Sequence, residues 1–243
     1  LTFCTLLNIG NEHFTKDVGL IPYGMYKYQG YDSFMATYIN GDYTNLKYTP
    51  GLRIEEVPKV SGDWVKDSCS WLRENAKRID VLNLYHLCER SLAHAKVYKS
   101  VNPRGKIYLK LDGSPMPAGR RHLRLLMPSL RLLSMCKAVS TEFEENAEKL
   151  SLAWTRASTY PPIYHRKRNI ICVPNPFNPN ELRDFRPFSE RSNIILFTGR
   201  VETEKGSPIL LEAFADIYTK IPGWKLKLVG AINENIADRF ASK

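Results

Sequence analysis

Short apolar segments alternate with longer amphipathic segments along most of this chain. The apolar segments have the length of strands, and the longer ones repeat apolar residues at helical spacing, most clearly from Asp63 to Arg78. Strands are predicted over residues 2–9, 33–39, 52–57, 81–84, 106–111, 138–140 and 170–173, and helices up to residue 29, over 63–78, 89–99 and 120–137, and up to residue 150. Such alternation predicts an α/β fold with a mostly parallel sheet flanked by helices.

Prolines and caps refine the predicted helix bounds. Pro22 is expected to break the first helix and Pro128 the long basic one, because proline removes a backbone donor and crowds the preceding turn. Asp63 is a suitable N-cap for the helix that follows it. Thr141 and Glu144 have the spacing of a capping box.

The segment from Asn193 to Gly230 has the most informative pattern. An apolar run at 194–197 predicts a buried strand, and a helical pattern then extends to residue 217. Pro222-Gly223 ends that helix, and alternation over 225–229 predicts a second strand. This is a strand-helix-strand unit, and open α/β sheets bind ligands at the carboxyl ends of such strands.

Two glycines and two cations lie at that end of the first strand: Gly199, Arg200, Lys205 and Gly206. A helix N-terminus offers unpaired N–H groups and partial positive charge. Arginine adds a forked permanent cation, lysine a mobile one, and glycine lets the backbone approach a ligand. The group suits a diphosphate, and the alternative is a Rossmann-like unit whose Arg and Lys are solvated.

The order of these elements, followed by Leu-Leu-Glu-Ala-Phe and Pro-x-Trp-x-Leu-x-x-Val-Gly, resembles the donor domain of the retaining glycosyltransferases of family 4. The resemblance implies the GT-B fold, with two Rossmann-like domains built on parallel sheets. It also implies that Arg200 and Lys205 contact the diphosphate of a nucleotide-sugar, with Gly199 and Gly206 beside it.

The resemblance divides the chain into an acceptor domain over 1–180, a linker over 181–192 and the first part of the nucleotide-sugar-binding domain over 193–243. The second domain has room for only two strands and the helix between them. The family's Glu-x7-Glu motif would follow Lys243. We therefore expect a fragment of a longer polypeptide, with an incomplete second domain.

Three further positions resemble the family's site. Gly19 falls in the loop that approaches the donor diphosphate, although an ordinary turn explains it equally well. His86 follows a strand where the family often has a histidine; it would bind an acceptor hydroxyl or a phosphate, or be structural. Asp112 follows another strand and would orient or deprotonate an acceptor hydroxyl. Leu111 stands where many members have a catalytic histidine, which puts the family's mechanism in question.

The charge of the chain is uneven. The net charge is +10, and residues 113–180 carry ten basic and four acidic side chains. A basic, leucine-rich segment within them can lie on an anionic membrane or form a core helix with a solvated basic face. Its cations are Arg120, Arg121, Arg124 and Arg131.

Composition excludes several other classes. No apolar run reaches the roughly 18 residues needed to cross a bilayer. The five cysteines are scattered without a C-x-x-C pair, which favours a reducing cytoplasm over disulfides or zinc. No acidic metal cluster is visible, and no cofactor is expected beyond the nucleotide-sugar substrate. Charge alone suggests nucleic acid, but no nucleic-acid motif supports it.

The sequence therefore predicts a glycosyltransferase that moves a sugar, with retention, from a nucleotide-sugar to a glycan or lipid-linked acceptor. Polysaccharide or glycoconjugate biosynthesis would be its setting, in the cytoplasm or peripherally on the cytoplasmic membrane face. The alternative is a non-catalytic homologue that binds an acceptor or a partner protein.

Overall fold

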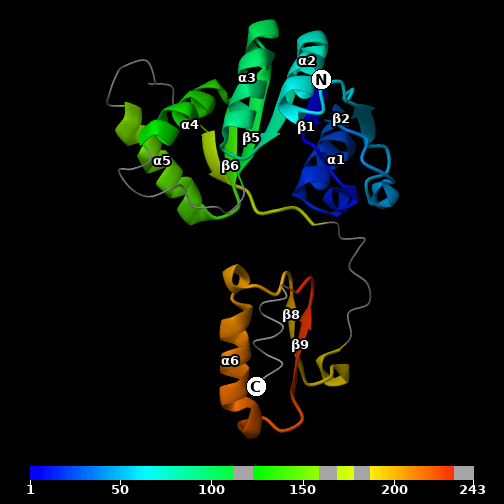
Figure 1. Cartoon of the computed structure of the whole chain (residues 1–243), viewed down its shortest axis with the longest axis vertical. Helices are drawn as coiled ribbons and strands as arrows, with labels where there is room; N and C mark the ends of the chain where they lie inside the picture. The colour runs from blue at the N-terminus through cyan, green and yellow to red at the C-terminus, as the bar shows by residue number, and fades with distance from the viewer. Residues whose placement is uncertain (112–122, 159–168, 178–186, 233–243) are drawn as a thin grey trace. The chain divides into compact units, whose positions relative to one another are not determined.

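The computed structural model describes residues 1–111, 123–158, 169–177 and 187–232. The chain separates into two compact units, Leu1–Glu181 and Leu182–Lys243 (Figure 1). Each unit is an α/β structure built on its own parallel sheet.

The first unit is built on a seven-stranded sheet with the order β3-β2-β1-β4-β5-β6-β7. Every neighbouring pair is parallel, as the alternating pattern predicts. The strands are β1 (Thr2–Leu6), β2 (Asp32–Thr37), β3 (Arg53–Glu56), β4 (Val81–Tyr85), β5 (Lys106–Leu111), β6 (Ala138–Thr141) and β7 (Asn169–Cys172). The strand order reverses between β1 and β4, because the chain continues from β1 to β2 on one side and from β4 to β5 on the other.

Helices cover the two faces of this sheet unequally. They are α1 (Asp17–Gln29), α2 (Trp64–Asn75), α3 (Glu89–Val101), α4 (Leu123–Met135) and α5 (Glu144–Ser158), with short 3-10 turns η1 (Asn11–Thr15), η2 (Thr44–Tyr48) and η3 (Ala76–Arg78). The larger core joins α2, α3, α4 and α5 to one face. The smaller core joins η1 and α1 to the other face, beside β2 and β4.

Alternation along β5 shows how one strand serves both faces. Ile107 and Leu109 enter the larger core. Successive strand residues point to opposite faces, so Tyr108 and Lys110 point to the α1 side. The smaller core, on the α1 side of the sheet, includes no residue of β5, β6 or β7 among the described residues.

Both proline expectations and one cap are wrong. Helix α1 runs unbroken through Pro22, which is itself buried, and α4 runs through Pro128. The Thr141 hydroxyl donates to the carbonyl of Phe143 (2.9 Å), and α5 begins only at Glu144, so Thr141 does not cap it. Asp63 does cap α2, accepting from the backbone N–H of Val65 and Lys66.

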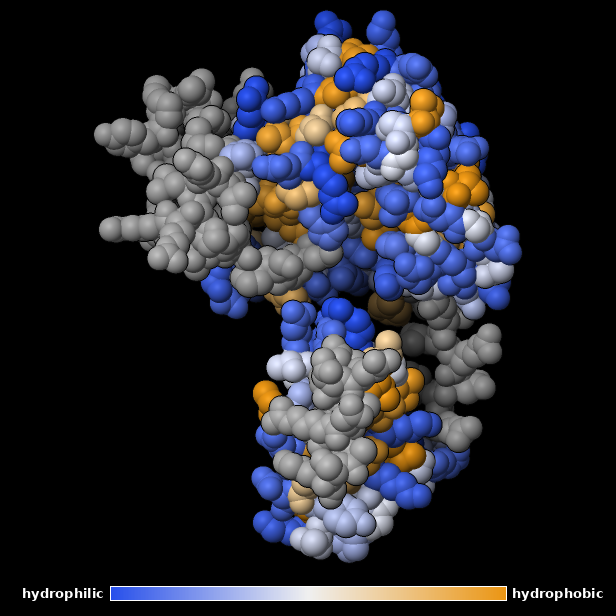
Figure 2. All heavy atoms as spheres, viewed as in Figure 1, coloured by the Kyte–Doolittle hydropathy of each residue, from blue (hydrophilic) through white to orange (hydrophobic). Residues whose placement is uncertain are grey.

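The second unit contains the strand-helix-strand pattern that the sequence predicts. Strands β8 (Ile194–Thr198) and β9 (Lys225–Val229) are parallel, and α6 (Ser207–Ile217) connects them. Short turns are η7 (Phe188–Glu190), η8 (Thr203–Lys205) and η9 (Tyr218–Lys220). Alternate residues of both strands are half-buried and the others exposed, so hydrophobic side chains appear on the surface beside β8 and β9 (Figure 2).

No helix in the described part of the chain is long and apolar enough to cross a membrane.

Candidate functional site

The carboxyl edge of the first sheet is the natural place for a ligand. The strand order reverses between β1 and β4, and open α/β sheets bind ligands at such a switch point. The loop and η1 turn after β1, and His86 after β4, flank this point. The residue after β5, Asp112, lies outside the described residues.

Gly19 lies inside the first turns of α1 rather than in the loop before it. A Cβ at this position would lie 2.6 Å from Phe14 Cα and 2.8 Å from the His13 carbonyl oxygen. Close packing of α1 on η1 is therefore a sufficient reason for a glycine here. Its contact with a donor diphosphate stays a prediction.

His86 directly follows β4 and has an unusual backbone. Its φ is 67°, the only positive value at a non-glycine among the described residues. Its N–H donates to the carbonyl of Lys110 (3.1 Å), and its exposed ring lies 6.3 Å from that of Tyr85. Backbone strain of this kind clusters at functional sites, which keeps His86 as a candidate.

The basic segment is described only in part. Arg120 and Arg121 lie outside the described residues. Arg124 lies in the first turn of α4, and Arg131 is exposed further along the same helix. The buried face of α4 includes Leu130, Leu132 and Leu133, so this part of the segment is a core helix with an exposed cation.

A fully buried lysine on β5 is a feature that the sequence analysis missed. Lys110 is 0% exposed, and its Nζ has no hydrogen-bond partner among the described residues. Nearby on the same face, the Tyr108 hydroxyl is 2.6 Å from Ser140 Oγ. Burial raises the pKa of Tyr108, although the Ser140 contact opposes this. The alternation of Lys106, Tyr108 and Lys110 is typical of a solvated strand face, so the sequence pattern did not predict that Lys110 is buried.

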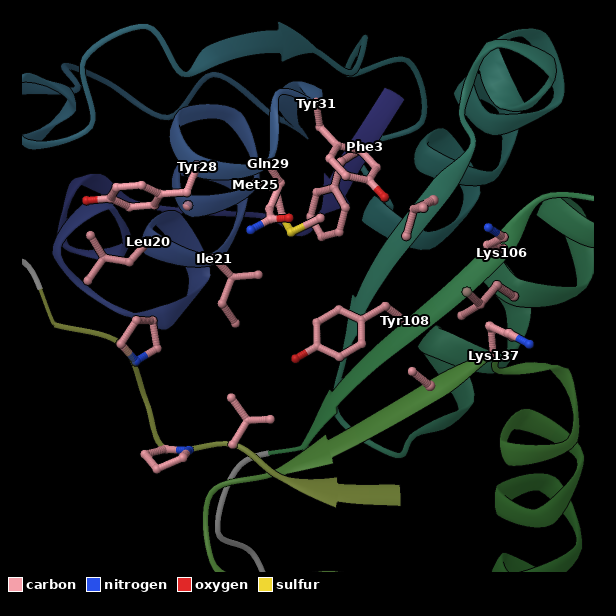
Figure 3. A pocket seen from close by; sticks show the side chains of 17 residues that line it. Phe3, Leu20, Ile21, Met25, Tyr28, Gln29, Tyr31, Lys106, Tyr108 and Lys137 are labelled. Atoms are coloured by element: carbon pink, nitrogen blue, oxygen red, sulfur yellow. The ribbon is translucent and has the colours of Figure 1, made fainter. Parts of the chain in front are cut away.

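A hollow of about 530 Å³ opens on the same face, between α1 and the sheet (Figure 3). Apolar side chains of α1, Tyr108 in the middle of β5 and the segment 173–176 form its walls. Lys106, the first residue of β5, and Lys137, which directly precedes β6, line its end at the amino edge. The hollow therefore runs along this face from the amino edge to the segment that follows β7 at the carboxyl edge, and neither His86 nor Lys110 lines it.

In the second unit, two glycines bring the ends of β8 and β9 together. The Gly199 N–H donates to the Val229 carbonyl (2.9 Å), and φ is 143° at Gly199 and 151° at Gly230. A Cβ on Gly230 would lie 1.9 Å from the Gly199 carbonyl oxygen. Both positions therefore require glycine, and Gly230 is a site-shaping residue that the sequence marked only as a strand end.

The predicted diphosphate contacts lie on the loop that follows. Gly206, with φ of 73°, leads directly into α6, and Lys205 before it is exposed. Arg200 Nη2 lies 2.9 Å from Glu202 Oε1, and its side chain is 62% exposed. An arginine has five N–H donors, so this ion pair orients the guanidinium and leaves donors for an anion.

Residues that could bind a metal ion do not cluster in the described part of the chain. Among the residues that the structure describes, no group of three or more His, Cys, Asp or Glu side chains is arranged to hold a metal ion.

Comparison with solved structures decides the fold. Anabaena HepE, crystallised with UDP and glucose, matches 100% of this chain at a TM-score of 0.65 and 13% identity. An alpha-glucosyltransferase in complex with UDP matches 99% at 0.62 and 13% identity. The fold is GT-B.

A third GT-B neighbour is a putative UDP-N-acetylglucosamine 2-epimerase from Listeria monocytogenes, with a TM-score of 0.56 and 10% identity over 99% of this chain. The chain spans 64%, 61% and 65% of the lengths of these three structures. No protein-family model and no curated protein sequence matches the chain.

Proposed function

We propose that this chain is part of a retaining glycosyltransferase of the family 4 type, with a nucleotide-sugar as its donor. The observation that carries the proposal is the loop after β8. There Gly199 and Gly230 close the strand ends, and Arg200 and Lys205 lie just before the N-terminus of α6. This combines two cations with a helix N-terminus, the chemistry that a diphosphate requires.

The structural neighbours support this donor chemistry. HepE and the alpha-glucosyltransferase share the fold and were crystallised with UDP. We infer a uridine diphosphate sugar as the first donor to test. No cofactor or metal is part of the proposal.

Transfer breaks the bond between the anomeric carbon and the diphosphate oxygen, and the acceptor oxygen forms a new bond to that carbon. Arg200 and Lys205 would stabilise the negative charge that develops on the leaving diphosphate, and such stabilisation usually contributes most to the rate of reactions of this kind. Asp112 would take the proton of the acceptor hydroxyl, and His86 would hold the acceptor. Gly19 and Gly206 would let backbone N–H groups approach the donor.

The acceptor would be a glycan or a lipid-linked glycan, in polysaccharide or glycoconjugate biosynthesis. The cations Arg120, Arg121, Arg124 and Arg131 would bring the protein to an anionic membrane surface on its cytoplasmic side. A related alpha-glucosyltransferase was crystallised with UDP-glucose and DNA, so a DNA acceptor belongs in the same assay as a comparison.

Substitution of Arg200 by Ala tests the function directly. Loss of a charge-assisted hydrogen bond is expected to weaken UDP binding by about 10- to 100-fold and to slow transfer by about 100-fold. Calorimetric titration of UDP and radiolabelled sugar transfer provide the two readouts. Lys220→Ala is the matched control, because this exposed lysine lies at the opposite end of α6.

The same variant separates the second candidate, a non-catalytic homologue that binds an acceptor or partner. Leu111, in place of the family's histidine, favours that candidate. It predicts that UDP binding is absent from the wild type and that Arg200→Ala leaves glycan or partner binding unchanged.

A further inference from the structure

Lys110 is the penultimate residue of β5, in the middle of the first sheet. In register it lies between Tyr85 of β4 and Ser140 of β6. Because Ile107 and Leu109 enter the larger core, the Lys110 side chain points to the other face, where α1 packs. Its position on the strand places it at the carboxyl edge, next to His86, whose N–H donates to its carbonyl.

The hydrogen bonds made by polar groups near Lys110 on this face do not include it, and Asn83 Oδ1 likewise has no hydrogen-bond partner within the described residues. Asn83 Nδ2 donates to Thr5 Oγ1 (3.0 Å), and the Tyr108 hydroxyl is 2.6 Å from Ser140 Oγ. The ammonium of Lys110 is completely buried, and no hydrogen bond reaches it within the described chain. An unpaired buried charge costs several kcal/mol, so a fold that tolerates one needs a reason.

The first turn of α1 lies against the same row of strand residues. The Tyr85 hydroxyl donates to the backbone carbonyl of Asp17, 3.2 Å away, and Tyr85 is the register neighbour of Lys110. This turn presents the positive end of a 13-residue helix to the same edge. Asp17 also brings a carboxylate there, but Lys110 Nζ makes no hydrogen bond to it.

We propose that Lys110 binds a phosphoryl group of a substrate at the carboxyl edge of the first sheet, together with the N-terminus of α1. A phosphate fits because its charge neutralises the ammonium and its oxygens accept from both the lysine and the backbone N–H groups. The phosphate has two sources, the diphosphate of the donor or a phosphate on the acceptor. The choice of these two substrates rests on the proposed function, whereas the site itself is inferred from the position and burial of Lys110.

Substitution of Lys110 by Met tests this with binding and stability together. Met keeps the length and removes the charge, so the variant is expected to lose about 10- to 100-fold in phosphate affinity, the range for a charge-assisted hydrogen bond. Its midpoint of thermal unfolding is expected to rise or stay level, because an unpaired buried charge is removed. A lysine that only holds the fold together would give the reverse, a lower midpoint with unchanged affinity.

The matched control is Lys106→Met, on the same strand but exposed at its amino edge. Calorimetric titrations of the full chain use UDP as the donor probe and glucose 6-phosphate as the probe for a phosphorylated acceptor. Weaker binding of UDP alone assigns Lys110 to the donor, and weaker binding of glucose 6-phosphate alone assigns it to the acceptor. If Lys110→Met binds both as the wild type does, or if the wild type binds neither, the proposal is wrong.

Arg200→Ala in the same series separates this proposal from the proposed function. If Arg200→Ala loses UDP binding and Lys110→Met keeps both ligands, the donor site stands and the Lys110 site is refuted. If Lys110→Met loses glucose 6-phosphate while the wild type binds no UDP, the Lys110 site stands and the nucleotide-sugar function fails.

Discussion

Two glycines of α1 meet opposite steric surroundings. A Cβ on Gly19 would approach backbone atoms of η1 to within 2.6 Å, whereas a Cβ on Gly24 would meet no atom within 4 Å. Both positions are helical, so the intrinsic gain from replacing glycine by alanine is similar, about 0.5–1 kcal/mol. Any difference in stability between alanine substitutions at these two glycines should therefore come from packing.

We expect Gly24→Ala to stabilise the protein by about 0.5–1 kcal/mol. Gly19→Ala is expected to destabilise it by about 1–3 kcal/mol, because backbone of η1 must move. Urea unfolding followed by circular dichroism measures both. Equal effects of the two substitutions would show that η1 is not packed on α1 as described.

Lys110 and Gly230 show what a sequence alone cannot give at this scale. Lysine at alternate strand positions is typical of a solvated face, and only the folded structure shows that Lys110 is buried. In the sequence, Gly230 is simply the glycine that follows the second predicted strand. Its contact with Gly199 depends on the pairing of β8 with β9, which sequence spacing does not specify.

At the scale of elements, two buried polar groups tie α2 to its surroundings. Asp67 accepts from the Tyr38 hydroxyl (2.7 Å) and from Ser61 and Gly62. Burial would raise its pKa, but these hydrogen bonds outweigh that and lower the pKa of Asp67 to about 2. On α3, His94 Nε2 is 2.7 Å from Ser68 Oγ of α2, and burial, assisted by Arg90, lowers the pKa of His94 to about 4.

Both shifts predict stability that is complete above neutral pH and lost in acid. Unfolded histidine has a pKa near 6.5, so the free energy of unfolding should fall between about pH 6.5 and 4, by on the order of 3 kcal/mol for His94. Unfolded aspartate has a pKa near 3.9, so Asp67 adds a second fall from about pH 4 to 2.

Urea unfolding at a series of pH values tests both windows. His94→Gln should remove the dependence in the upper window, and Asp67→Asn should remove the lower one and also reduce stability at neutral pH. An unchanged pH profile in His94→Gln would show that this histidine titrates normally.

Most elements could be predicted because strand length and helical spacing are local properties. The prediction failed at Pro22 because burial of the helix against the sheet offsets one missing backbone hydrogen bond. It also failed at Thr141, where the hydroxyl already donates to Phe143. Tertiary packing decides both cases, and the local pattern does not contain it.

At the scale of the whole molecule, the chain carries a formal excess of ten positive charges. An anionic membrane attracts such a protein, and each basic residue near the surface adds about 1 kcal/mol. Arg131 is the exposed cation of the basic segment within the described part of the chain.

We expect the protein to sediment with phosphatidylglycerol vesicles and not with phosphatidylcholine vesicles, with binding that weakens as salt rises. Arg131→Gln should weaken it about fivefold, the effect of about 1 kcal/mol. The control is Arg73→Gln, since Arg73 is exposed on α2. Equal effects of the two substitutions would indicate attraction by net charge alone, without a basic patch.

The overall architecture followed from the alternation of strands and helices, but the strand order did not. A parallel sheet requires crossover connections, and nothing in the pattern of β1 specifies that β4 pairs with it. The candidate site depends on this pairing, because it brings the loop after β1 next to His86.

The central position of β1 also has a consequence for how the protein is made. Both neighbours of β1 come later in the chain, and Phe3 pairs with Val81. During synthesis β1 therefore leaves the ribosome with two open edges and remains unpaired on the β4 side until the chain has passed Tyr85. We expect a nascent chain that depends on chaperones during this interval, and a first unit that folds only after most of its sheet has been translated.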